Sequence, residues 1–321
     1  MQHLIFDGNH LFHKTFSVWS TYYRGQDMET VLKSKENRQI LLRKCIIDLC
    51  HTVKKFRNVK DVTVVIDSSS WRYKFYADYK YALTRVKESH YQQFLECLNE
   101  FEQFLRDKGL IVSRVQGAEG DDLMYIWALY YGFLENEHTV IVTGDSDIRQ
   151  LITRNVSLYN NNSKNLRIYC HKDCESYWRN NFDADTEIVE TEAFEVLLYK
   201  VIMGDTSDNI PKLRQGFGKK AFDKFLESIR PYNEPTDVSL AQMAMWIVKR
   251  FAEFTHTPEE QYINNVIFNL QMTWLNLSAY NESGVTIPLL KRMLKEANAL
   301  KGSYRYDGQY TLESMYGMLI K

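Results

Sequence analysis

Four short apolar runs, separated by longer stretches with helical spacing, most strongly constrain the fold of this 321-residue chain. The runs are residues 3–6, 61–66, 110–115 and 139–143. Such runs are typical of buried strands, whereas the apolar side chains from Phe94 to Leu105 recur at helical intervals. Strands that alternate with helices predict an α/β fold with a mostly parallel central sheet flanked by helices on both faces.

The rest of the chain shows two other patterns. Polar residues 160–165 separate two short β-like runs, which predicts a hairpin. From Glu192 onward the spacing is mostly helical, with a break between Pro231 and Pro235. We therefore expect an α/β core over residues 1–190 and a helical region over residues 191–321.

The composition indicates a folded intracellular protein. Hydrophobic residues make up 45% of the chain, which is ample for a core. Five scattered cysteines are too few for a disulfide framework, so a reduced, cytoplasmic compartment is expected. No run of about 18 apolar residues is present and the chain opens directly on the first strand, so neither membrane contact nor a targeting segment is expected.

Charge is unevenly distributed, although the net charge is −1. Residues 70–90 carry five basic and two acidic side chains, and residues 212–230 carry six basic and two acidic. Solvated helix faces would explain these basic segments as well as a binding role would, when charge is considered alone. In a neutral chain they also imply that acidic residues are concentrated elsewhere.

Carboxylates follow three of the predicted strands. Asp7 directly follows the first apolar run, Asp67 the second, and Asp145 and Asp147 lie just beyond the fourth. Because the carboxyl ends of parallel strands share one edge of a sheet, we expect these acids to converge there.

Five further acids lie at the ends of predicted helices. Glu119, Asp121 and Asp122 open a helix after the third run, and Asp205 and Asp208 follow an apolar helical stretch. Each acid alone is explained by helix capping or turn formation. All nine together are not, because like charges a few ångströms apart cost several kcal/mol per pair at an effective dielectric constant of about 20.

Bound cations would make such a cluster tolerable. Oxygen ligands without His or Cys select Mg²⁺ or Mn²⁺. Two such ions, about 3.5–4 Å apart, suit phosphodiester hydrolysis, because they activate a water and neutralise charge on the phosphate. The sequence therefore predicts phosphoryl chemistry.

Five motifs occur in a fixed order between residue 6 and about residue 226. They are Phe6-Asp7-Gly8-Asn9, Ile66-Asp67, Ala118-Glu119-Gly120-Asp121-Asp122, Thr143-Gly144-Asp145-Ser146-Asp147 with Gln150-Leu151, and Met203-Gly204-Asp205-Thr206-Ser207-Asp208-Asn209-Ile210-Pro211. The set resembles the 5′-nuclease superfamily of flap endonucleases and 5′-3′ exonucleases. Trp71-Arg72 followed by Tyr79-Lys80 is similar to the phage-encoded RNase H branch, which removes RNA primers behind the replication fork.

The resemblance implies a PIN-like 5′-nuclease fold with two metal sites. The ligands implied for the first site are Asp7, Asp67, Glu119 and Asp121. Those for the second site are Asp145, Asp147, Asp205 and Asp208, with Asp121 or Asp122 between the sites. The implied cofactors are two Mg²⁺ ions, for which Mn²⁺ is expected to substitute.

Lys80 matches the active-site lysine of the family's arch, here within residues 70–105, which contacts the scissile phosphate. The alternative is an ordinary solvated lysine. Asp121, Arg72 and Arg85 complete the expected catalytic set, the arginines as phosphate contacts, and Lys74 is expected to contact nucleic acid. Where the family shows Tyr-Lys-x-Asn-Arg, this chain reads Tyr79-Lys80-Tyr81-Ala82-Leu83-Thr84-Arg85, which leaves the role of Arg85 open.

Residues 213–221 resemble the hairpin of the family's helix-hairpin-helix element, here about residues 194–230. Gly216 and Gly218 would let backbone amides approach a phosphate, and K⁺ is the cation implied at this element. Arg214, Lys219 and Lys220 are expected to contact the duplex without reading its sequence. A Gly-x-Gly on its own usually marks only a turn.

We therefore expect a monomeric, structure-specific 5′→3′ exonuclease and flap endonuclease that acts on duplex DNA and RNA·DNA hybrids and removes RNA primers. A PIN-type single-strand endoribonuclease and a catalytically idle structure-specific DNA-binding protein are the alternatives. The hairpin element argues against the first alternative, and the nine carboxylates argue against the second.

A sliding clamp or a single-strand-binding protein is a candidate partner. The spacing within Gln309-Tyr310-Thr311-Leu312-Glu313-Ser314-Met315-Tyr316 resembles a clamp-binding peptide. The buried face of a terminal helix is the favoured explanation of the same spacing.

Overall fold

The computed structural model contains two compact units. The described residues are 2–81, 84, 88–161, 166–182, 186–276, 279 and 286–303. The first unit draws on residues 1–69, 86–191 and 292–321, and the second on residues 70–85 and 192–291. Among the described residues, this division differs from the sequence-based one, because residues 70–81 group with the helical unit and residues 292–303 group with the core.

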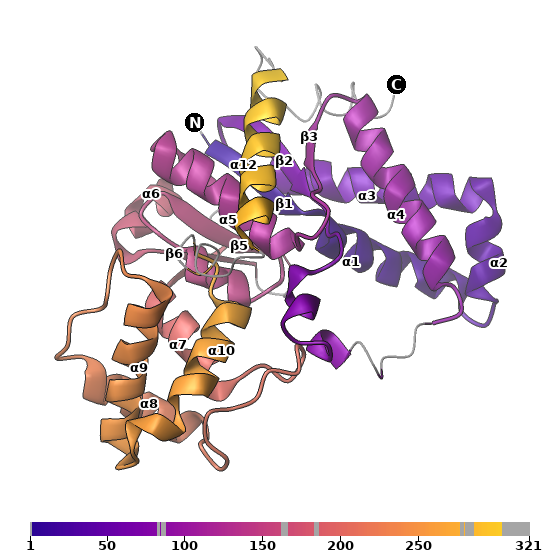
Figure 1. The fold of residues 1–321 in the computed structure, drawn as a ribbon. Helices are drawn as coiled ribbons and strands as arrows, with labels where there is room; N and C mark the ends of the chain where they lie inside the picture. Colours follow the sequence, from indigo (N-terminus) through magenta and orange to yellow (C-terminus); the bar gives the residue numbers. More distant parts are fainter. Residues whose placement is uncertain are drawn as a thin grey trace. The chain divides into compact units, whose positions relative to one another are not determined.

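The first unit is built on a seven-stranded sheet (Figure 1). Its strands are β1 (Gln2–Asp7), β2 (Val59–Val65), β3 (Ile111–Ser113), β4 (His138–Val142), β5 (Val156–Asn160), β6 (Arg167–Cys170) and β7 (Glu187–Glu190). Their order is β3-β2-β1-β4-β5-β6-β7, and every neighbouring pair is parallel except β5 with β6. The predicted mostly parallel sheet is confirmed, and each of the four apolar runs overlaps one of the strands β1 to β4.

The expected hairpin corresponds to the antiparallel pair β5 and β6. Its turn, residues 162–165, lies outside the described residues.

Helices cover both faces of this sheet. They are α1 (Gly8–Ser20), α2 (Met28–Lys33), α3 (Lys35–Val53), α4 (Tyr91–Asp107), α5 (Gly120–Ala128), α6 (Glu175–Asn181) and the later part of α12 (Thr286–Ser303). Leu4 and Phe6 of β1 belong to a core shared with α1, α3 and α4. Because successive side chains of a strand alternate between faces, His3 points to the other face, where it stacks on Tyr131 just after α5.

The second unit is helical, as expected for the C-terminal region. Helices α7 (Ala193–Met203), α8 (Lys219–Ile229), α9 (Leu240–Thr255) and α10 (Ile263–Thr273) pack around an aromatic core that contains Phe225 and Phe251. Residues 204–218 connect α7 to α8, at the place predicted for the helix-hairpin-helix element. No helix in the described ranges is long and apolar enough to span a membrane.

Two short 3₁₀ turns, Trp71–Lys74 and Tyr79–Tyr81, belong to this second unit. The reason is apolar packing, because the buried ring of Tyr79 clusters with Ile210 and Met272. Within this segment, Tyr79 is therefore held by contacts with residues far from it in the sequence.

Candidate active site

The carboxyl edge of the sheet has a switch point between β1 and β4. The chain leads from β1 to β2 and β3 on one side, and then returns to the other side of β1 with β4. Open α/β sheets bind ligands at such a point, beyond the carboxyl ends of the strands. Asp7 is the last residue of β1 and Thr143 directly follows β4, so both residues lie there.

Thr143 links the acids that follow these two strands. Its Oγ1 donates to Asp7 Oδ2 at 2.8 Å and accepts from the Asp145 backbone amide at 3.1 Å. The other Asp7 oxygen accepts from the His10 amide at 2.8 Å, as the N-cap of α1. Asp145 Oδ1 accepts from the Asp147 amide at 2.8 Å. Hydrogen bonds thus hold three predicted metal ligands in one connected group.

The ionised form of Asp7 is electrostatically destabilised. Burial raises the pKa of Asp7 from 3.8 to about 6, hydrogen bonds from His10 and Thr143 oppose the shift, and the charge of Asp145 adds to it. A cation near Asp7 and Asp145 would stabilise both charged groups. Since the donors are all oxygen atoms, they fit Mg²⁺ or Mn²⁺.

Asp67 is fixed between the starts of two helices. Its backbone amide donates to Asn9 Oδ1 in α1 at 2.8 Å, and its Oδ1 accepts from the amide of Gly120, the first residue of α5, at 2.5 Å. A Cβ atom at Gly120 would lie 2.7 Å from that oxygen, so any side chain there would displace Asp67. Asp67 is therefore tied to the segments that carry Asp7 and Glu119.

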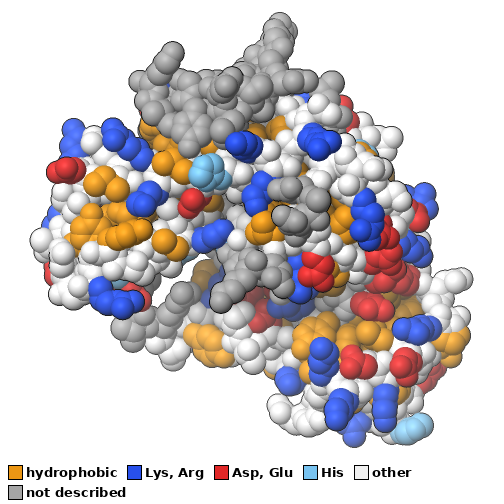
Figure 2. Space-filling model, turned by 180° about the vertical axis from the view of Figure 1, so that it is seen from behind, with side chains coloured by type: hydrophobic (Ala, Val, Ile, Leu, Met, Phe, Trp, Pro, Cys, Tyr) orange, Lys and Arg blue, Asp and Glu red, His pale blue; other side chains and the backbone are white. Residues whose placement is uncertain are grey.

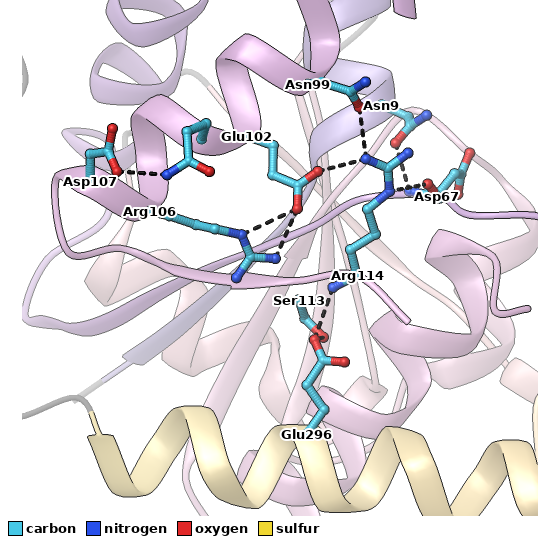
Figure 3. Close-up of polar contacts among 10 residues, drawn as sticks. Asn9, Asp67, Asn99, Glu102, Arg106, Asp107, Ser113, Arg114 and Glu296 are labelled. Atoms are coloured by element: carbon cyan, nitrogen blue, oxygen red, sulfur yellow. Dashed lines mark hydrogen bonds and ion pairs between the residues drawn. The ribbon is translucent and has the colours of Figure 1, made fainter. Parts of the chain in front are cut away.

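Sequence reasoning missed Arg114, which follows β3 (Figure 3). Its Nε donates to the Asp67 carbonyl at 3.1 Å, and its Nη1 donates to Glu102 Oε2 at 2.7 Å. Glu296 of α12 accepts from the Arg114 amide at 3.0 Å. Arg114 thus braces the Asp67 segment against α4 and α12. A lone arginine after an apolar run gives no sign of these contacts in the sequence.

The acids at the start of α5 have different environments. Asp122 is completely buried, and its Oδ2 accepts from the Glu119 amide at 2.9 Å. This is the helix-capping role that the sequence left open for each acid. Glu119 is 6% exposed and Asp121 is half-buried, and both remain predicted metal ligands.

In the second unit, both oxygens of Asp205 are engaged. Oδ2 accepts from Lys200 Nζ at 2.5 Å, and Oδ1 accepts from the Ser207 amide at 2.8 Å. Burial alone would raise the pKa of Asp205, but Lys200 and Ser207 hold it below its usual value. These contacts shape the turn after α7, a structural role that accompanies the predicted role in metal binding.

Lys80 lies next to Asp208, although the two residues are far apart in the sequence. The Lys80 amide donates to the Asp208 carbonyl at 3.1 Å, and the Tyr79 hydroxyl donates to Asp208 Oδ2 at 3.0 Å. Lys80 Nζ lies 5.1 Å from the centre of the Tyr79 ring. The structure thus joins the predicted catalytic lysine to a predicted metal ligand.

Asn209 fixes the same junction. Its Nδ2 donates to the Tyr76 hydroxyl at 2.8 Å, and to the Asp78 carbonyl and Oδ2 at 3.1 and 2.9 Å. Asn209 has a φ of 60° and Lys80 a φ of 52°, a left-handed conformation that costs about 1–2 kcal/mol for most side chains. We call segments 76–81 and 204–211, joined by these contacts, the Lys80 junction.

The other residues predicted to contact phosphate are placed differently. Arg72 is 3% exposed, and its Nε donates to the Met272 carbonyl at 2.8 Å. Its burial favours a structural role over the predicted phosphate contact. Lys74 is exposed. Arg85 and the predicted clamp-binding segment 309–316 lie outside the described residues.

The predicted nucleic-acid interface surrounds the start of α8. Gly216 has a φ of 76°, and Gly218 is the N-cap of the helix. Lys219 and Lys220 are exposed in its first turn, and exposed Arg214 donates to the last carbonyl of α9 at 3.2 Å. Exposed lysines at a helix N-terminus suit a phosphate. On the face shown in Figure 2, basic and acidic side chains are interspersed.

A family model matches more than half of the chain. It describes the N-terminal resolvase-like domain of 5′-3′ exonucleases and matches residues 2–179. The chain belongs to this 5′-3′ exonuclease family. A 5′-3′ exonuclease of Buchnera aphidicola subsp. Acyrthosiphon pisum is 26% identical over 165 residues, which are 49% of this chain and 50% of the relative. DNA polymerase I of Chloroflexus aurantiacus is 28% identical over 165 residues, 50% of this chain and 16% of the polymerase. The chain thus spans half or less of the length of these two relatives.

The fold is shared with the 5′-exonuclease of bacteriophage T5, whose structure has been solved with divalent zinc ions. The TM-score is 0.57 at 18% identity, with 94% of this chain and 99% of the phage protein covered. This likeness confirms the expected 5′-nuclease-like α/β architecture.

Proposed function

We propose that this chain is a divalent-metal-dependent 5′→3′ exonuclease and flap endonuclease that acts on duplex DNA and RNA·DNA hybrids. The observation that carries the proposal is the hydrogen-bonded group of Asp7, Thr143 and Asp145 at the β1–β4 switch point of a 5′-3′ exonuclease family member. A T5 flap endonuclease with the same fold has been solved as a pseudo-enzyme-product complex with DNA and metal ions.

The residues that would hold the ions in the first unit are Asp7, Asp67, Glu119, Asp121, Asp145 and Asp147. Their oxygen-only character favours Mg²⁺, with Mn²⁺ as a substitute. When bound, two such ions activate a water and neutralise charge that develops on the phosphate. The raised pKa of Asp7 supports this assignment, because a nearby cation would stabilise the ionised carboxylate that burial disfavours. The ligand roles of Asp205 and Asp208 remain predictions.

Other residues of the chain would position the substrate. Lys80, held in place by the Lys80 junction, would donate to the scissile phosphate. Lys219 and Lys220 would contact the duplex backbone, and K⁺ would bridge the preceding hairpin to a phosphate. Binding of this kind depends on salt and does not depend on base sequence.

RNA primer removal is the role we propose, because Trp71-Arg72 and Tyr79-Lys80 are similar to the phage RNase H branch. The enzyme would act as a monomer in the cytoplasm of a host cell.

Cleavage of three 5′-labelled substrates tests the proposal. They are a DNA flap, a nicked RNA·DNA hybrid and single-stranded RNA, each incubated with Mg²⁺ or with EDTA. We expect Mg²⁺-dependent cleavage of the flap and the hybrid and little cleavage of the RNA. Preferential cleavage of the RNA would indicate a PIN-type endoribonuclease, and flap binding without cleavage would indicate an idle DNA-binding protein.

A further inference from the structure

A second polar cluster lies at the amino-terminal edge of the same sheet, opposite the candidate active site. His3 of β1 is completely buried, and its Nδ1 lies 3.0 Å from Asp61 Oδ2 of β2. Its Nε2 contacts Glu137, just before β4, and lies 4.0 Å from Glu135 Oε2. Ligand atoms of His3, Glu135 and Glu137 all lie within 4.8 Å of one another. We call these four residues the amino-edge cluster.

An aromatic ring fixes the orientation of the His3 imidazole. The ring of Tyr131 stacks on it, with centroids 3.8 Å apart and an interplanar angle of 12°. Nε2 is hydrogen-bonded to Glu137, whereas the buried Nδ1 has no hydrogen-bond partner, although Asp61 Oδ2 lies 3.0 Å away. The carboxylates of Asp61, Glu135 and Glu137 converge on this one buried ring, and a bound cation would offset the repulsion between them. A carboxylate on one ring nitrogen is also the usual partner of a histidine that binds metal through the other.

The charges around His3 match a divalent ion. Asp61, Glu135 and Glu137 supply three negative charges. Lys60 supplies one positive charge, with Nζ 2.9 Å from Glu137 Oε1. With a neutral imidazole, these groups leave two negative charges, which one divalent ion would balance.

The backbone that carries the two glutamates is irregular. A π-helical turn, Leu129–Leu134, ends directly before Glu135. Between the glutamates, Asn136 has a left-handed φ of 52°. Single π-helical turns are rare in proteins overall, but those that occur are often found at functional sites. The irregular segment thus places both carboxylates at the buried imidazole of a neighbouring strand.

We propose that the amino-edge cluster binds a Zn²⁺-type transition-metal ion through His3 Nε2, Glu135 and Glu137, with Asp61 orienting the imidazole. An imidazole ligand favours Zn²⁺ over Mg²⁺, unlike the oxygen-only carboxyl edge. The ion would tie β1 to the segment before β4 and, through Asp61, to β2. This inference is independent of the proposed nuclease activity, because the cluster lies at the other end of β1.

Zn²⁺ titration of the EDTA-treated, desalted full-length protein, in excess Mg²⁺, tests the proposal. Calorimetry and metal analysis count the bound ions, and Co²⁺ serves as a spectroscopic probe of mixed nitrogen and oxygen ligands. The wild type is expected to bind one Zn²⁺ ion per chain at this cluster. The variants Glu135→Gln and His3→Asn are expected not to bind this ion. Asp61→Asn is expected to weaken binding of this ion about 10- to 100-fold.

Two variants serve as controls. His138→Gln should keep the ion, because His138 begins β4 at the same edge but stacks on Tyr177 with centroids 3.8 Å apart. Asp145→Asn, at the carboxyl edge, should also keep it, so that loss of nuclease activity and loss of this ion are separable.

Glu135→Gln is the deciding variant, because the Glu135 side chain is 27% exposed and its replacement does not require repacking, whereas His3 is buried. Equal Zn²⁺ binding by the wild type and Glu135→Gln would overturn the proposal. Absence of Zn²⁺ binding by the wild type would also overturn it. Either result would make the cluster a metal-free network of ion pairs and hydrogen bonds among His3, Lys60 and the carboxylates.

Discussion

At the scale of single residues, Asp7 couples stability to pH. Its folded-state pKa, about 6, lies above the ordinary value of 3.8, so ionisation destabilises the folded state. In the metal-free protein, protonated Asp7 therefore contributes to the free energy of unfolding. This contribution is fully present below about pH 4 and is lost as pH rises through about 6, on the order of 3 kcal/mol in total. Urea unfolding of the EDTA-treated wild type and Asp7→Asn should therefore show a stability difference that grows with pH in favour of the variant. A difference that does not change with pH would contradict this account.

Two predicted ligands differ in environment and should differ on substitution. Asp67→Asn is expected to abolish Mg²⁺-dependent cleavage while flap binding survives, because a ligand charge is lost and repulsion of phosphate decreases. Asp122→Asn should retain most activity, because the side-chain oxygen of the new asparagine can still accept a hydrogen bond from the Glu119 backbone amide. Single-turnover cleavage and equilibrium binding of a flap measure both effects. Near-normal turnover by Asp67→Asn would remove Asp67 from the metal site.

At the scale of elements, the Lys80 junction should act as a unit. Lys80→Ala is expected to lower single-turnover cleavage about 100-fold or more. Asn209→Gly removes three hydrogen bonds but tolerates the left-handed backbone, so it should also slow cleavage with little change in flap binding. When Asn209→Gly is combined with Lys80→Ala, the cleavage rate should fall little further than in Lys80→Ala alone, because coupled residues give non-additive effects.

Asn155→Gly is the matched control for Asn209→Gly. Asn155 also joins two loops, since its Nδ2 donates to the Gly132 carbonyl at 3.0 Å and to Asn136 Oδ1 at 2.7 Å, but it belongs to the first unit. Its replacement should leave the cleavage rate unchanged. Fully additive effects of Lys80→Ala and Asn209→Gly would show that the junction does not position Lys80.

Sequence patterns predicted the elements that carry local signals. The strands β1 to β4 were predictable because continuous apolar runs mark buried parallel strands, and the meeting of Asp7 with Asp145 followed from the shared carboxyl edge. Strand β7 was not predicted, because its side chains are exposed or half-buried and form no apolar run. The contact of Arg114 with Asp67 and that of Tyr79 with Ile210 each join segments that are distant in the sequence. Such pairs produce no periodic pattern from which they could be predicted.

At the scale of the whole molecule, the proposed nucleic-acid binding would arise from local charge. The chain has a net charge of −1, so long-range attraction to DNA would be weak, and the proposed binding would depend on the basic segment 212–230. Lys219 and Lys220 are exposed at the start of α8. Each phosphate neutralised on B-DNA contributes about −0.9 to the slope of log K against log salt concentration.

Replacing both lysines, Lys219→Ala with Lys220→Ala, is therefore expected to make that slope shallower by roughly 2. Affinity should fall equally for duplexes of different sequence, because backbone contacts carry no base information. Fluorescence anisotropy over a salt series measures the slope. The control is Lys33→Ala with Lys35→Ala, which removes the same charge from exposed lysines at α2 and α3 and should leave the slope unchanged. Equal changes in both double variants would show that net charge governs binding, and an unchanged slope in the first would exclude the start of α8 from the duplex interface.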